Sequence, residues 1–130
     1  MKLNRRTIAA AIAIAPLAGL LPGAVWAQKP IVLGFSQVGA ESEWRTANTE
    51  SIKSAAKEAG IELKFSDAQQ KQENQIKAIR SFIAQKVDVI AFSPVVESGW
   101  EPVLREAKAA KIPVVLTDRA VNTKDTSLYV

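Results

Sequence analysis

The stretch "PIVLGFSQVGAESEWR", residues 30–45, decides the fold, because the rest of the chain repeats its plan. Residues 30–38 form an apolar run that Gly39 ends, which is typical of a buried strand. Ser42 can then cap a helix that Gly60 stops. The face of this helix is predicted from apolar residues at roughly helical spacing: Trp44, Ala47, Ile52, Ala55, Ala56 and Ala59.

Further strands and helices alternate outward from this unit. Residues 61–68 alternate apolar and polar side chains with a period of two, which predicts a strand near the sheet edge. The helical spacing of Ile76, Ile79 and Ile83 predicts a second helix. The apolar runs at residues 87–95 and 112–118 predict two buried strands. The sequence therefore predicts an α/β fold of the order βαβαβαβ, a parallel sheet with helices on both faces.

Two local signals refine this prediction. Ser98 and Glu101 fit a capping box at the start of the third helix, and Pro102 falls in its first turn. The stretch "SLYV", residues 127–130, has the character of the start of a fifth strand. We expect the chain to be the opening part of a longer protein.

The N-terminus has the pattern of a cleaved secretion signal. "MKLNRR" is a basic n-region, an apolar segment with Pro16 and Pro22 follows, and "AVWA" ends in a small residue. We expect residues 1–27 to be a signal peptide and residues 28–130 to remain in the periplasm. A membrane anchor is the alternative, and Arg5-Arg6 leaves both the general and the twin-arginine export routes open.

Composition excludes several classes of function. The chain has 17 basic and 13 acidic residues, but three of the basic ones lie in the first 27 residues, which hold no acid. The remaining 14 bases against 13 acids give no reason to expect nucleic-acid binding. Cysteine and histidine are absent, as are phosphate-binding loops and the G-x-S-x-G motif. We therefore expect a binding protein rather than an enzyme, with no cofactor and no metal.

Ligands of open parallel sheets bind beyond the carboxyl ends of the strands. The residues that the predicted strands deliver to that edge are Ser36, Gln37, Asp67, Ser93, Pro94, Asp118 and Arg119. Carboxylate and guanidinium groups match the hydroxyls of a sugar, and an indole such as that of Trp44 packs on its C–H face. The sequence thus favours a sugar site at this edge.

Other interpretations of these residues stay open. Asp118 and Arg119 could form only a polar turn or a mutual ion pair, Trp44 could staple the first helix to the sheet, and Arg45 could be solvated. Glu41 and Glu43 are interpreted as solvated acids rather than a catalytic pair. We expect Trp100 to anchor the third helix and Asp67 to cap or turn the loop before the second helix.

Long motifs also carry a family resemblance: "GFSQVGAESEWR", "QQKQENQIKAIRSF", "SGWEPVLREAK" and the "TDR" after the fourth strand. Residues 29–130 resemble the first lobe of type I periplasmic sugar-binding proteins, the ribose- and galactose-binding group, and most closely the galactofuranose-binding members that serve bacterial ABC importers. The resemblance implies two lobes that close on the ligand, a membrane permease as partner, and a monomer.

The resemblance also implies roles for individual residues. Glu41, Trp44 and Arg45 would meet the sugar from the first loop, Asp118 and Arg119 would bind ring hydroxyls, and Gln37 would line the site. Two other functions remain as alternatives: the effector lobe of a transcription regulator with the same fold, and a sugar receptor for chemotaxis.

Overall fold

The computed structural model describes residues 28–130, so the predicted signal peptide lies outside the described residues. Within them, strands and helices alternate as predicted. In chain order the elements are β1 (Val32–Gln37), α1 (Glu43–Glu58), β2 (Glu62–Asp67), α2 (Gln72–Ala84), β3 (Val89–Phe92), α3 (Glu101–Ala109), β4 (Val114–Leu116) and the 3-10 turn η1 (Thr126–Leu128).

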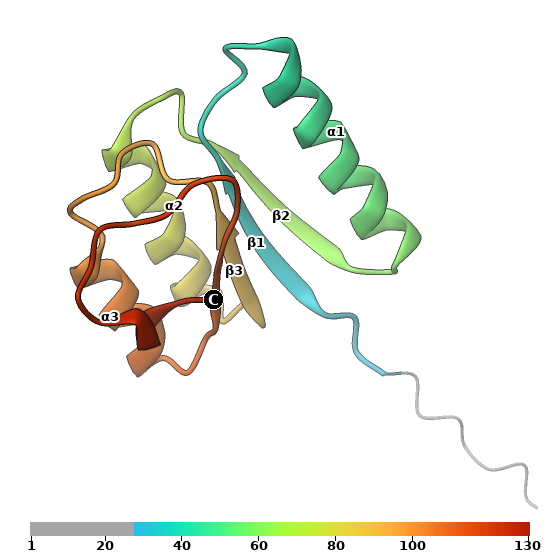
Figure 1. The fold of residues 1–130 in the computed structure, drawn as a ribbon. Helices are drawn as coiled ribbons and strands as arrows, with labels where there is room; N and C mark the ends of the chain where they lie inside the picture. Colours follow the sequence, from blue (N-terminus) through green and yellow to red (C-terminus); the bar gives the residue numbers. More distant parts are fainter. Residues whose placement is uncertain (1–27) are drawn as a thin grey trace, which may run out of the picture.

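The strands form one parallel sheet in the order β2-β1-β3-β4. Helix α1 lies on one face of the sheet, and α2 and α3 lie on the other (Figure 1). The predicted α/β architecture with helices on both faces is therefore confirmed. Strand β2 is at the edge, as its alternating pattern predicts, and most of its side chains are half-buried.

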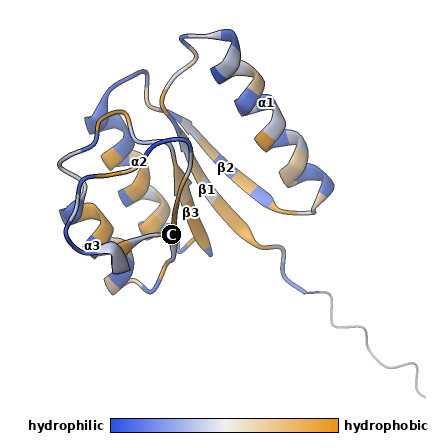
Figure 2. Cartoon of the chain, viewed as in Figure 1, coloured by the Kyte–Doolittle hydropathy of each residue, from blue (hydrophilic) through white to orange (hydrophobic). Residues whose placement is uncertain are grey.

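The main hydrophobic core lies between the sheet and the pair α2 and α3. Ile79 and Phe82 of α2 and Leu104 of α3 are buried against Ile90 and other apolar side chains of β3. Strands β1 and β3 are hydrophobic along most of their length, whereas β2 and α1 are mixed (Figure 2). Because burying a large apolar side chain stabilises by about 1.5–3 kcal/mol, this face contributes most of the hydrophobic stabilisation.

Close packing of α2 on β1 depends on a glycine. A Cβ atom at Gly34 would lie 2.5 Å from Cγ of the Phe82 ring. Any larger side chain at this position would force the ring, and with it α2, away from the sheet. Gly34 thus sets the distance at which α2 packs.

Helix α1 begins and ends as predicted. The hydroxyl of Ser42 accepts a hydrogen bond from the backbone N–H of Arg45 at 3.2 Å. Gly60, with a φ of +66°, donates to the carbonyl of Lys57, and Ile61 donates to that of Ala56. This pair of bonds closes the helix with a residue in the left-handed region, which glycine adopts without strain.

The predicted apolar face of α1 is only partly correct. Ile52 is half-buried and Ala56 is buried, but the other four predicted members, Trp44, Ala47, Ala55 and Ala59, are exposed. The helix instead turns a stripe toward the sheet that begins with polar residues: Arg45, Asn48, Thr49, Ile52 and Ala56. Hydrogen bonds and ion pairs of the first three residues, described below, outweigh the burial of small alanines.

The predicted capping box of α3 is wrong. Trp100, not Ser98, occupies the N-cap, and it makes no side-chain cap bond. The Glu101 carboxylate pairs with Arg105 one turn later. Trp100 is nevertheless the predicted anchor, since its ring is buried 4.8 Å from that of Phe92 and its Nε1 donates to the carbonyl of Val96. Pro102 lies in the first turn, as predicted.

The predicted start of a fifth strand is only partly correct, because Ser127 and Leu128 belong to the turn η1 (Thr126–Leu128). The Asp125 carboxylate accepts from the N–H of Ser127 and so stabilises that turn. Only Val130 pairs with β4: its N–H donates to Val114, and its carbonyl accepts from Leu116, both at 2.8 Å. In the described part of the chain, no helix has the length and apolar character needed to cross a membrane.

Replacing Gly34 by alanine tests the packing of α2. We expect Gly34→Ala to lower the free energy of unfolding by about 1–3 kcal/mol, the usual cost of overpacking a core, as measured by equilibrium urea unfolding. The control is Ser36→Ala on the same face of β1. It adds no volume and removes a buried hydroxyl that has no hydrogen-bond partner, so it should leave stability unchanged or slightly raised. Equal stability of Gly34→Ala and the wild type would show that Gly34 does not set the spacing.

Candidate functional site

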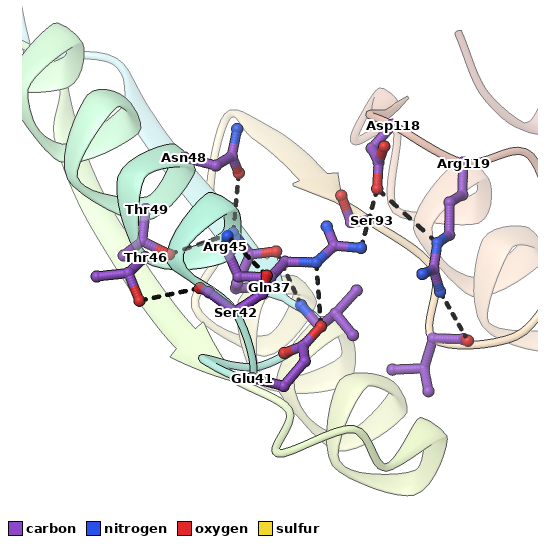
Figure 3. A network of polar contacts seen from close by, with 12 residues as sticks. Gln37, Glu41, Ser42, Arg45, Thr46, Asn48, Thr49, Ser93, Asp118 and Arg119 are labelled. Carbon is purple, nitrogen blue, oxygen red and sulfur yellow. Dashed lines mark hydrogen bonds and ion pairs between the residues drawn. The ribbon is translucent and has the colours of Figure 1, made fainter.

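The carboxyl edge of the sheet gathers five of the six predicted site residues. Glu41 lies in the loop after β1, Trp44 and Arg45 lie in the first turn of α1, and Asp118 and Arg119 follow β4. The loops after parallel strands meet at one edge, so segments more than 70 residues apart in the sequence come into contact. Figure 3 shows the side chains of Arg45, Asp118 and Arg119 converging there.

Arg45 is the centre of this site. Only 5% of the residue is exposed, which rules out the alternative of a solvated arginine. Its Nε lies 3.2 Å from Oε1 of Glu41, and its Nη2 lies 3.0 Å from Oδ2 of Asp118 (Figure 3). A buried guanidinium needs such partners, because an unpaired buried charge is strongly destabilising. Arg45 therefore ties α1 to the loop after β4.

One nitrogen of Arg45 remains without a partner. Its Nη1 is buried and makes no hydrogen bond to any described residue. Buried donors are nearly always satisfied, and exceptions in native structures tend to mark functional positions. Nη1 of Arg45 is thus an unsatisfied donor that lies beneath the surface of the site.

The backbone turns sharply at Asp118 to present its carboxylate. Its φ is +67°, a left-handed conformation that is uncommon for residues other than glycine. The N–H of Arg119 donates to the carbonyl of Thr117 across this turn at 2.7 Å. Ser93, at the end of β3, donates from its hydroxyl to the same carbonyl at 3.0 Å. The strained residue is therefore supported on both sides by neighbouring contacts.

Arg119 extends the chain of charges outward. Its Nε lies 3.8 Å from Oδ2 of Asp118, and its Nη1 donates to the carbonyl of Val95 at 3.3 Å. The alternative of a mutual Asp118–Arg119 ion pair is thus present but long, and Asp118 lies closer to Arg45. About half of the Arg119 side chain is exposed. Glu41, Arg45, Asp118 and Arg119 together form what we call the ion-pair chain.

Trp44 lies beside the ion-pair chain on the surface. Its exposure of 53% shows that it does not staple α1 to the sheet. The guanidinium carbon of Arg45 lies 4.8 Å from the centroid of its ring, within the range of a cation–π contact. An exposed indole next to paired charges offers an apolar face and hydrogen-bonding groups side by side.

Gln37 is the predicted site residue that the structure places beneath the others. It is 1% exposed, and its Nε2 donates to Oδ1 of Asn48 at 2.9 Å and to Oγ1 of Thr49 at 3.2 Å. Its Oε1 accepts from the N–H of Val38. Gln37 therefore lies beneath the site and fixes the rotation of α1. The polar residues Arg45, Asn48 and Thr49 are spaced three and four residues apart, and this spacing is a sequence signal from which the polar inner face could have been predicted.

Two more polar residues shape the edge. Asp67 accepts from the N–H of Gln69 at 2.8 Å, which confirms the predicted turn before α2. Gln75 of α2, which the sequence analysis missed, is fully buried and donates to the carbonyl of Ser93 at 2.7 Å. No sequence signal separates it from the exposed glutamines nearby.

The surroundings of the site are open. A hollow of about 560 Å³ borders Glu41, Ser42 and Thr46 on the outer side of the first turn of α1. Within residues 28–130, no group of acidic residues is arranged to hold a metal ion. The charged side chains of the site and the exposed Trp44 offer hydrogen bonding and stacking.

Comparison with known proteins identifies the family. Residues 33–130 match the family described as "Periplasmic binding protein domain". The chain is 63% identical over 100 residues to the galactofuranose-binding protein YtfQ of Escherichia coli, covering 77% of this chain and 31% of that protein.

Solved structures agree with this comparison. The periplasmic binding protein of the arabinose ABC transporter from Shewanella sp. ANA-3, bound to α- and β-L-arabinofuranose, has a TM-score of 0.75 and 65% identity, covering 75% of this chain and 32% of that one. A Mycobacterium smegmatis protein in complex with β-D-fucofuranose has a TM-score of 0.75 and 72% identity, covering 76% and 33%. The chain spans about a third of the length of these relatives. Over residues 33–130, it belongs to the family of periplasmic binding protein domains.

Proposed function

We propose that this chain is the N-terminal lobe, residues 28–130, of a periplasmic receptor that captures a sugar and delivers it to the permease of an ABC importer. The observation that carries the proposal is the ion-pair chain at the carboxyl edge, with Trp44 exposed beside it. The sugar would be galactofuranose or a related furanose, since relatives are named for galactofuranose, arabinofuranose and fucofuranose.

The charges of the site suit hydroxyl groups rather than an ion. Oδ2 of Asp118 is held by Arg45, whereas Oδ1 makes no hydrogen bond or ion pair with a described residue, so this oxygen can accept from a hydroxyl. The exposed side of Arg119 can donate. Adjacent acceptors and donors match neighbouring hydroxyls, each of which both donates and accepts.

Binding in this lobe would be completed by a second lobe. A sugar on the described surface would be covered on one side only, because Trp44 and Arg119 are about half exposed. Closure of a second lobe would exclude water, which strengthens hydrogen bonds to charged groups. The closed form would then be recognised by the permease. We propose a receptor and not an enzyme, because the relatives of this chain are described as sugar-binding proteins.

Removal of Arg119 tests the site directly. In the full-length protein we expect Arg119→Ala to weaken sugar binding by about 1.5–3 kcal/mol, the contribution of hydrogen bonds to a charged group. Isothermal titration calorimetry with L-arabinose, D-fucose, D-galactose and D-fructose would measure it. The control is Arg105→Ala, since Arg105 is similarly exposed but lies on α3 and pairs with Glu101. If the two variants bind alike, Arg119 is not a ligand residue.

Trp44 provides an optical test. We expect Trp44→Ala to weaken sugar binding by about 1 kcal/mol while the unfolding midpoint stays unchanged, because the ring is exposed and supports no core. Sugar should also shift the tryptophan emission of the wild type to shorter wavelength, and Trp44→Phe should remove most of that shift. Trp100→Phe is the matched control, since Trp100 is buried under α3. A shift that persists in Trp44→Phe would place the sugar elsewhere.

A further inference from the structure

Gln75 is a buried amide whose hydrogen-bonding groups are all engaged at the site edge. Its Nε2 donates to the carbonyl of Ser93 at 2.7 Å and, at 3.5 Å, to that of Ser36. Its Oε1 accepts from the N–H of Val95 at 2.9 Å. The residue is fully buried in the first turn of α2. Gln75 therefore joins the carboxyl ends of β1 and β3 to the loop that follows β3.

A second contact connects this loop to the ion-pair chain. The carbonyl of Val95 accepts from Nη1 of Arg119 at 3.3 Å. Val95 thus contacts both residues through its backbone. Its N–H donates to Gln75, and its carbonyl accepts from Arg119. The position of the Arg119 guanidinium therefore depends on the backbone of Val95, which the buried Gln75 holds in place.

We infer that Gln75 is a positioning residue for sugar binding, which rests on the proposed function. It fixes Val95 so that the carbonyl of this residue holds the guanidinium of Arg119 in the orientation that donates to the oxygen of a ring hydroxyl. Gln75 itself is covered on all sides and does not touch the ligand. Its effect on binding passes through Arg119, and this separates it from a residue that only stabilises the fold.

A double-mutant cycle measures that route. In the full-length protein, Gln75→Met keeps the length of the side chain but removes its hydrogen bonds. We expect it to weaken L-arabinose binding roughly tenfold in calorimetry. In the Arg119→Ala background the same change should alter the affinity less than about twofold. Equal losses in both backgrounds would overturn the inference, because a purely structural residue acts independently of Arg119.

The matched control is Gln72→Met. Gln72 belongs to the same helix turn and holds the same loop, but its Nε2 donates to the carbonyl of Ser98, beyond Val95. We expect this variant to retain wild-type affinity. A loss as large as that of Gln75→Met would mean that general order of the loop, and not the position of Val95, governs binding.

Hydrogen exchange of the wild-type protein gives a test that does not depend on a stable variant. The N–H of Val95 should exchange slowly although its loop is at the surface, and added L-arabinose should slow it further, while the exposed Glu97 should not respond. Rapid exchange at Val95, or no response to the sugar, would overturn the inference. If the wild type gives no heat with any sugar in the panel, the proposed function fails instead.

Discussion

The buried guanidinium of Arg45 is the constraint on which the site depends. A charge that is 5% exposed persists only with partners, and its partners come from two loops at opposite ends of the described chain, Glu41 and Asp118. Their approach fixes the rotation of α1 and the direction of the turn after β4. The fold places these loops at one edge, and the ion pairs of Arg45 hold them together.

The same constraint explains why α1 departs from a simple amphipathic pattern. Its inner side begins with a charge and two polar residues that engage Gln37, and only its second half is apolar. A helix packed purely by hydrophobic contact would turn Trp44 inward. Because the polar side chains are satisfied by the end of β1, the indole is left on the surface beside the charges.

The sequence was sufficient for the architecture, since buried strands, alternating helices and the cap at Ser42 follow from local patterns. Topology alone also placed Asp118 and Arg119 at the carboxyl edge. The family resemblance implied that Glu41, Trp44 and Arg45 lie there too. The burial of individual polar side chains could not be predicted from local sequence patterns. Arg45 and Gln75 are inside because of partners distant in sequence, and Ser98 lost its cap role because Trp100 packs on Phe92.

The two faces of the sheet are covered very differently, and this difference affects which part of the protein unfolds first. On one side α2 and α3 bury large apolar side chains, whereas the inner stripe of α1 combines a few polar bonds with only two apolar residues, Ile52 and Ala56. Partial unfolding follows the weakest packing, so α1 should detach before the global transition. A ligand that contacts Arg45 and Asp118 together would stabilise the folded form of α1 and so suppress that local unfolding. The order of α1 and the affinity for the ligand would then increase together.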